Sequence, residues 1–277
     1  MFKLSVITIN YNNLGGLITT ISSVKRQTWQ EFEYIIIDGG STDGSKEYIE
    51  KEDEYLNYWV SEKDSGIYNA MNKAINVAKG EYLLFLNSGD HLFNDIVLEQ
   101  NHASIIEKDL IYFNLQMVRN GISRITKSPA ELSFSDLYTT SLPHPATFIK
   151  KELFNKVGMY DESLRIVSDW KFFTLALFKF NCSYLKIEDT LSTFYLDGLS
   201  TLEDNSYERE LVMKQYFNRF ITDYELLIES KKYLNTNRFK MLIEIEKSVF
   251  GQKLVSLIFR IFIFFLNKNR IKENFII

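Results

Sequence analysis

Three apolar stretches of the chain each end in polar residues beside glycine or asparagine, and this repeated pattern limits the folds open to it. They read Leu4-Ser-Val-Ile-Thr-Ile-Asn10, Glu33-Tyr-Ile-Ile-Ile-Asp38 and Tyr82-Leu-Leu-Phe-Leu-Asn-Ser-Gly-Asp90. Helical patterns separate them, over Leu17–Gln27, Ser45–Lys51 and Ile67–Ala78. Strands that alternate with helices predict βαβ units, and hence an α/β fold with a mostly parallel sheet flanked by helices.

The carboxyl ends of parallel strands meet at one edge of a sheet, and ligands bind beyond that edge in open α/β folds. Asn10, Asp38 and Asp90 stand at the ends of three predicted strands. We therefore expect these side chains to converge on one cleft.

The rest of the chain predicts further elements and one boundary. Strands are expected at Leu56–Val60, Ile111–Val118, Thr147–Ile149 and Thr193–Tyr195, and helices at Lys151–Val157 and Asp169–Phe180. From Tyr207 the pattern is helical. We therefore divide the chain at about residue 205, into a body of residues 1–205 and a C-terminal helical extension of residues 206–277.

Cysteine and histidine usage excludes two kinds of protein. The single cysteine, Cys182, rules out a disulfide framework and a CxxC metal cluster. The three scattered histidines have no zinc-binding spacing. The residues after Met1 lack the long apolar region and the cleavage site of a signal peptide, so we expect a cytoplasmic protein.

Charge is unevenly distributed along the chain. Residues 231–277 carry ten Lys and Arg against three Glu, a net charge of +7, while the whole chain has −4 and residues 1–230 therefore have −11. An acidic body argues against a nucleic-acid partner. A basic tail fits contact with anionic lipid.

The tail contains an apolar run, Leu254–Leu266, interrupted only by Ser256 and Arg260. As a helix it is about 20 Å long, shorter than the roughly 30 Å hydrocarbon core of a bilayer. We expect a helix lying in the plane of the inner face of the plasma membrane. Packing on the body of the protein, or on a second copy in a homo-oligomer, is the alternative.

Four segments resemble glycosyltransferase family 2, the inverting sugar transferases of bacterial polysaccharide synthesis with the GT-A fold. They are SVITINYNN, YIIIDGGSTDGS, GIYNAMNKAINVAKGEYLLFLNSGD and the later SDW. The resemblance implies a GT-A (Rossmann-like) catalytic domain over 1–205, with a nucleotide-binding half at 1–95 and an acceptor-binding half at 96–205. It implies a nucleotide-sugar donor, expected to be UDP-linked, and a saccharide or lipid-linked acceptor.

The resemblance also implies which residues bind the donor. Thr8, Asn10 and Tyr11 correspond to the nucleoside pocket, although a plain strand-end turn is the alternative. Asp38 corresponds to the acid at the nucleobase, while Asp43 is expected to cap the next helix. Asp64 and Asn72 correspond to the loop around the diphosphate. Asn72 has an alternative role in satisfying buried backbone, and Met71 stands where many members have arginine.

NSGD matches the Asp-x-Asp position of the family, with Ser88 in place of the first acid and Asp90 as the second. Hard divalent ions prefer oxygen ligands, and Mg²⁺ often takes one or two carboxylates together with substrate phosphates. We therefore expect Asp90 to hold Mn²⁺ or Mg²⁺ against the donor diphosphate, with Ser88 assisting through water.

The family places its catalytic base on an acidic motif at the start of a helix, which is Ser168-Asp169 here. Asp169 is therefore the predicted base, and helix capping is the alternative for both residues. His144, between two prolines, is expected to contact acceptor or diphosphate, or to be structural. Gly198–Ser200 is expected to form a loop that closes over the donor.

Two other functions are compatible with such a fold. A nucleotidyltransferase shares the glycine-rich α/β start, but it needs basic residues at the first strand end, and NYNNLGG has none. A non-catalytic scaffold is the second alternative, and retention of both Asp90 and Asp169 argues against it.

Overall fold

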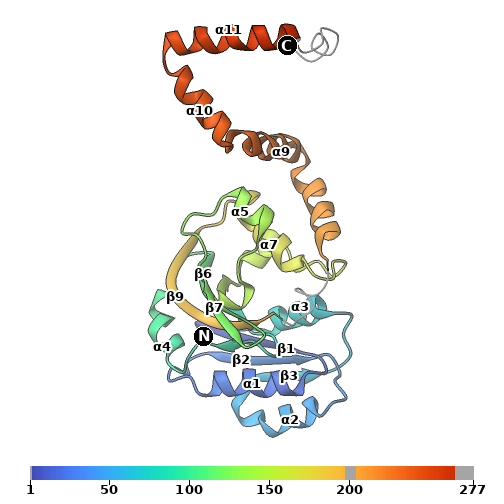
Figure 1. Ribbon diagram of the computed structural model, residues 1–277. Helices are drawn as coiled ribbons and strands as arrows, with labels where there is room; N and C mark the ends of the chain where they lie inside the picture. The colour runs from blue at the N-terminus through green and yellow to red at the C-terminus, as the bar shows by residue number, and fades with distance from the viewer. Residues whose placement is uncertain (1, 197–203, 266–277) are drawn as a thin grey trace. The chain divides into compact units, whose positions relative to one another are not determined.

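A computed structural model describes residues 2–196 and 204–265 of the chain (Figure 1). Within them, one sheet has the order β3-β2-β1-β4-β8-β6-β9-β5, with β7 paired to β6. The strands are β1 (Leu4–Asn10), β2 (Glu33–Asp38), β3 (Tyr58–Ser61), β4 (Tyr82–Phe85), β5 (His91–Leu92), β6 (Leu110–Arg119), β7 (Ile122–Thr126), β8 (Thr147–Lys150) and β9 (Tyr184–Tyr195). The helices are α1 (Leu14–Lys25), α2 (Ser45–Lys51), α3 (Ile67–Val77), α4 (Val97–Asn101), α5 (Phe134–Thr139), α6 (Leu153–Val157), α7 (Ser168–Phe178), α9 (Ser206–Leu234), α10 (Asn237–Glu246) and α11 (Val249–Phe265).

The first four strands form the parallel half of the sheet. β1 pairs with β2 and β4, and β2 pairs with β3, all in parallel. Helices α1 and α2 lie on one face and α3 on the other (Figure 1). Every residue of β1, β2 and β4 is buried, which explains their nearly continuous apolar runs. The register sets Asn10 beside Asp38, and Asp38 beside Ser61, so the carboxyl ends are level.

The second half of the sheet is mixed. β8 runs antiparallel to both β4 and β6, whereas β6 and β9 are parallel, with register shifts around Asn114. The predicted α/β class is thus confirmed, with the parallel order concentrated in β1 to β4. Strand β9 is much longer than the Thr193–Tyr195 segment predicted. Its exposed polar residues Glu188 and Asp189 interrupt the apolar pattern, which hid the earlier part of the strand.

The predicted start of the first helix is wrong. α1 begins at Leu14 and not at the predicted Leu17, because the Asn13 side chain accepts a hydrogen bond from the Gly16 backbone N–H at 3.1 Å and caps the helix. α2 begins at Ser45, as predicted. Asp43, expected to cap this helix, accepts hydrogen bonds from the backbone N–H groups of Ser45 and Leu14, at 3.1 and 2.8 Å, and so serves the starts of both helices.

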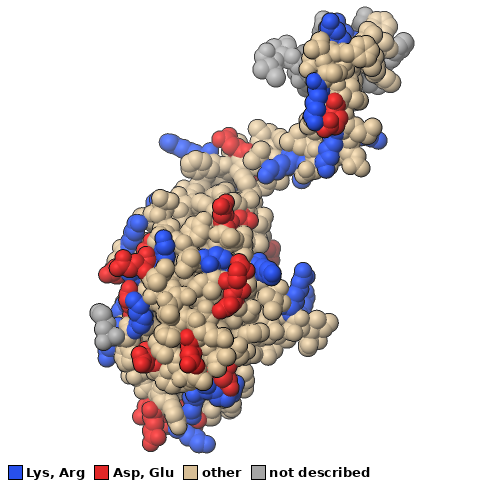
Figure 2. Space-filling model, turned by 90° about the vertical axis from the view of Figure 1, so that its left-hand side faces the viewer, with Lys and Arg blue, Asp and Glu red and all other residues tan. Residues whose placement is uncertain are grey.

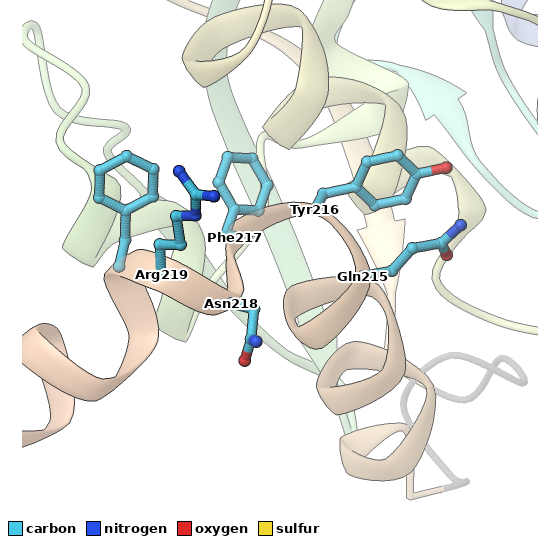
Figure 3. A pocket seen from close by; sticks show the side chains of 6 residues that line it. Gln215, Tyr216, Phe217, Asn218 and Arg219 are labelled. Atoms are coloured by element: carbon cyan, nitrogen blue, oxygen red, sulfur yellow. The ribbon is translucent and has the colours of Figure 1, made fainter.

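Contacts divide the chain into two compact units, Met1–Glu210 and Leu211–Ile277. The first turn of α9 therefore belongs to the first unit, a few residues beyond the boundary placed at 205. In the second unit, α9 is kinked at Phe217, whose φ and ψ are −129° and 17°. A hollow at this kink is lined by consecutive residues 215–220 and contains none of the predicted site residues (Figure 3).

Gly80 is required by close packing between the α3–β4 turn and β1. A Cβ on Gly80 would lie 2.4 Å from Ser5 Oγ and 2.5 Å from the Ser5 backbone nitrogen. Because backbone must shift to admit it, Gly80→Ala is expected to lower the free energy of unfolding by about 1–3 kcal/mol. Urea unfolding followed by circular dichroism measures the change.

Gly15→Ala is the matched control. Gly15 is exposed in α1 and has no atom within 4 Å of an added Cβ. Since alanine favours helix over glycine, this change is expected to stabilise the protein by about 0.5–1 kcal/mol. Equal effects of the two substitutions would contradict the packing argument.

Candidate active site

The Asp38 carboxylate joins three strand ends at the carboxyl edge. Its Oδ1 accepts hydrogen bonds from Asn10 Nδ2 at 2.7 Å and Ser41 Oγ at 2.6 Å. Its Oδ2 accepts from the Ser41 backbone N–H at 2.9 Å and Ser61 Oγ at 2.6 Å. Burial alone would raise the pKa of Asp38, but these hydrogen bonds outweigh it and lower the pKa below its ordinary value.

The residues predicted for the nucleoside pocket take different positions around this carboxylate. Thr8 is fully buried, and its hydroxyl lies 3.1 Å from that of Tyr34. Asn10 is buried beside Asp38, and its Oδ1 has no hydrogen-bond partner among the described residues. Tyr11 is 66% exposed. Of the three, Tyr11 therefore offers the most surface to a ligand.

The loop that carries Ser88 and Asp90 is held by the side of α1. The Thr20 hydroxyl donates to the Asp90 backbone carbonyl at 2.6 Å and accepts from the Gly89 N–H at 3.0 Å. Asn13 Nδ2 donates to the Ser88 carbonyl at 2.9 Å. Ser88 is half-buried and Asp90 is 6% exposed. Thr20 and Asn13 were missed from the sequence, because nothing in an apolar helix pattern indicates that its polar residues anchor a distant loop.

The chemistry of this loop fits a divalent cation only in part. No group of three or more His, Cys, Asp or Glu side chains suited to a metal occurs among the described residues. The oxygen groups at the loop are the Asp90 carboxylate, the Ser88 hydroxyl and Asn87 Oδ1, which is buried and lacks a hydrogen-bond partner within the described chain. Such a set suits a hard cation whose remaining ligands come from a bound diphosphate.

The two other residues predicted for the donor lie at α3, Asp64 in the loop before it and Asn72 within the helix. Asp64 is half-buried, and its Oδ1 accepts the Gly66 backbone N–H at 3.0 Å. Asn72 donates to the Tyr160 carbonyl at 2.9 Å and to Glu162 at 2.8 Å, and it accepts the Tyr160 N–H at 3.0 Å. These contacts match the alternative role of Asn72, that of satisfying buried backbone.

Asp169 lies in the first turn of α7, but neither it nor Ser168 caps the helix. Its Oδ1 accepts a hydrogen bond from the Tyr68 hydroxyl of α3 at 2.9 Å, and the residue is half-buried. The Ser168 hydroxyl accepts from the Asp161 backbone N–H instead. The capping alternative for both residues is therefore wrong, and a carboxylate faces the start of α3.

His144 lies in an aromatic cluster between β4 and α7. It is 7% exposed, its Nε2 lies 2.9 Å from the Tyr160 hydroxyl, and its ring stacks on Phe85 with centroids 4.8 Å apart. Burial lowers the pKa of His144, although the charge of Asp169 opposes the shift. The geometry matches its structural alternative. Because Tyr160 also contacts Tyr68, the cluster links the end of β4 to the partner of Asp169.

Two residues at the start of α9 contact the segments on either side of Asp169 and were missed from the sequence. The Glu208 carboxylate accepts three successive backbone N–H groups, those of Arg165, Ile166 and Val167, at 2.7, 3.0 and 3.2 Å. The Arg209 guanidinium lies 4.7 Å from the centroid of the Trp170 ring, next to Asp169 in the chain. Glu208 is far from these partners in sequence and belongs to no motif, so no local signal could have identified it.

Residues 5–168 match the family model of Glycosyl transferase family 2. The chain is also 32% identical over 209 residues to an uncharacterized glycosyltransferase of Mycobacterium tuberculosis, covering 73% of this chain and 78% of the relative. A PGL/p-HBAD biosynthesis glycosyltransferase of Mycobacterium bovis is 30% identical over 181 residues, which are 62% of this chain and 68% of that one. The chain therefore belongs to glycosyltransferase family 2 and is a glycosyltransferase.

Solved structures agree on the fold. Staphylococcus aureus TarS in complex with UDP-GlcNAc has a TM-score of 0.63 at 24% identity, over 77% of this chain and 65% of that one. The mannosyltransferase PcManGT of Pyrobaculum calidifontis, in complex with GDP-Man and Mn²⁺, has a TM-score of 0.55 at 15% identity, over 92% and 79%. The predicted GT-A architecture is confirmed, and the nucleotidyltransferase alternative is set aside. The predicted Gly198–Ser200 loop lies outside the described residues.

Glu208 is expected to position the loop that precedes Asp169. Glu208→Gln removes the charge that three backbone donors share, so we expect a loss of about 1–3 kcal/mol in unfolding free energy. The rate of sugar transfer should fall as well, because the start of α7 loses its support. Tyr207→Ala, at a 69% exposed position in the same turn, is the control. Full stability and activity in Glu208→Gln would contradict the role.

Proposed function

We propose that the protein transfers a sugar, with inversion, from a UDP-linked donor to a saccharide or lipid-linked acceptor in cell-surface polysaccharide synthesis. The observation that carries the proposal is the hydrogen bond from Tyr68 to Asp169, which holds a half-buried carboxylate at the start of α3. Family membership and the UDP-GlcNAc bound by TarS support a nucleotide-sugar donor.

On the donor side, Asp90 is the proposed ligand of Mn²⁺ or Mg²⁺, assisted by Ser88. When bound, the cation supplies positive charge that neutralises the departing diphosphate. Thr20 and Asn13 hold the backbone of the Asp90 loop, so the carboxylate is kept at the strand edge. The Mn²⁺ in the complex of the Pyrobaculum mannosyltransferase supports a divalent ion in this fold.

On the acceptor side, Asp169 is the proposed general base. It takes the proton of the acceptor hydroxyl while the oxygen forms a bond to the anomeric carbon and the bond from that carbon to the diphosphate breaks. Tyr68 and Glu208 orient the base and its loop. We assign positioning roles to Asn72 and His144, because both are buried and bonded to Tyr160.

An isosteric substitution of Asp169 and a truncation of Asp90 separate the role of the base from that of the cation ligand. Asp169→Asn is expected to lower kcat by about 10²–10⁴-fold, because the proton acceptor is lost, while UDP still binds. Asp90→Ala is expected to abolish the dependence of UDP affinity on Mn²⁺. The kcat of Asp169→Asn is measured as UDP release from a panel of UDP-sugars, with a bacterial membrane lipid extract as acceptor source. The affinity of Asp90→Ala for UDP, with and without Mn²⁺, is measured by calorimetry.

Asp95→Ala is the control, because Asp95 is exposed and pairs with Arg26 at 3.1 Å. It should leave both quantities unchanged. Wild-type turnover in Asp169→Asn would assign the base to another residue, and Mn²⁺-dependent UDP binding in Asp90→Ala would remove Asp90 from the cation site.

We further propose that α11 binds the surface of an anionic membrane. Among the described residues, no helix combines the length and apolarity needed to cross a bilayer. Large apolar side chains are nevertheless exposed around α11, including Phe250 at 76%, Phe262 at 62% and Phe264 at 67%. Lys253 and Arg260 lie on the same helix, which contains no acidic residue. On the face of the body seen in Figure 2, acidic and basic groups are interspersed. Residues 231–277, in contrast, have a net charge of +7.

Vesicle sedimentation tests the membrane contact. The protein should bind vesicles of phosphatidylcholine with phosphatidylglycerol, and Lys253→Glu with Arg260→Glu should weaken binding by at least about tenfold, because each basic residue contributes about 1 kcal/mol near such a surface. Lys46→Glu, an exposed change in α2, should have no effect. A dimer in light scattering without vesicle binding would show that α11 joins two copies instead.

A further inference from the structure

The carboxylate expected at the nucleobase, Asp38, has no acceptor position left. An ionised carboxylate offers about four lone-pair sites. In Asp38 all four are used by Asn10, Ser41 and Ser61, through two bonds to each oxygen, and the residue is fully buried. A base bound at this edge must therefore be read by another group.

The structure provides a second carboxylate at the same edge. A Cβ built on Gly39 would lie 2.6 Å from Asp64 Oδ2 and 3.1 Å from Cδ2 of the Tyr11 ring. The Asp64 oxygen and the Tyr11 ring therefore lie on either side of the space next to the Gly39 Cα. Because Gly39 has no side chain, the Asp64 carboxylate fits there. Asp64 Oδ1 is bonded to the Gly66 N–H, whereas Oδ2 has no partner among the described residues.

The chemistry of Tyr11 and Asp64 narrows the choice of nucleobase. The Tyr11 ring is 66% exposed and offers a flat face on which a base can stack. An ionised carboxylate only accepts hydrogen bonds, so it favours a base with an N–H on its pairing edge. Uracil has N3–H there, whereas cytosine has an unprotonated N3 that a carboxylate repels. Guanine also has an N–H there, so the choice of uracil follows from the UDP-linked donor proposed above.

We propose that Asp64, and not Asp38, reads the nucleobase, with Oδ2 accepting N3–H of a uracil that stacks on Tyr11. Asp38 instead fixes the strand ends around the base. The inference deepens the proposed function and rests on it, since it names the residue that selects a UDP-linked donor.

Calorimetric affinities of UDP and CDP in the presence of Mn²⁺ test the assignment on the full chain. Wild type should prefer UDP, and Asp64→Asn should reduce the UDP-to-CDP preference by about 10-fold or more, because a charged hydrogen bond is lost and cytosine is no longer repelled. Glu62→Gln, in the same loop and paired to Lys73 at 2.7 Å, should keep the wild-type preference.

The second measurement moves the carboxylate from position 64 to position 39 and compares the affinities for UDP and CDP again. Gly39→Asp alone should lose UDP binding, because the new side chain collides with Asp64. Gly39→Asp combined with Asp64→Ala should recover the preference for UDP, since one carboxylate again faces the space beside Tyr11. A merely structural role of Asp64 does not predict such rescue.

The outcomes distinguish this inference from the proposed function. An unchanged UDP-to-CDP preference in Asp64→Asn, or its loss in Asp38→Asn with retention in Asp64→Asn, would overturn the assignment of Asp64. Tighter binding of GDP than of UDP to wild type would overturn the choice of uracil. Failure of wild type to bind any of the nucleotides would instead overturn the proposed donor site itself.

Discussion

The hydrogen bonds of Asp38 hold together the edge of the sheet on which the rest of the site depends. A buried carboxylate is tolerated in a protein interior only when its oxygens are satisfied. Here the partners come from β1, from the turn after β2 and from β3, so satisfying one group fixes three strand ends. The lowered pKa of Asp38 keeps the group ionised at neutral pH, and the turn therefore retains its shape. Tyr11 and Asp64 are held at this edge as a consequence.

The acceptor side is organised by contacts between distant parts of the chain. Asp169 begins a helix without capping it, and Tyr68 from α3 supplies a hydrogen bond to its carboxylate. Glu208 accepts hydrogen bonds from the backbone N–H groups just before Asp169 in the chain. Tyr160 links this region to the end of β4. The proposed base and the proposed cation loop are thereby connected through packed aromatic rings.

Features of this molecule that depend on interactions between neighbours in the sequence could be predicted, whereas features that depend on contacts between distant residues could not. The buried strands β1 and β2 and the bounds of α2 were predictable, because burial on both faces and a glycine-rich turn leave local signals. The strand β9 was mostly missed, since the exposed polar residues Glu188 and Asp189 in its middle break the apolar pattern. Site residues at strand ends could be located, but not their partners. Whether Asp38 is free or saturated, and whether Glu208 reaches the base loop, depend on contacts that no motif contains.

The anchoring of the Asp90 loop by α1 has a consequence for how mutations in this family should be interpreted. Thr20 is fully buried and touches only protein, yet its hydroxyl bridges both sides of the turn at Gly89. Loss of this hydroxyl would release the Asp90 loop and lower activity in the same way as loss of a proposed cation ligand. Functional maps built from activity alone would then assign Thr20 to the proposed cation site, although its hydroxyl contacts only backbone groups.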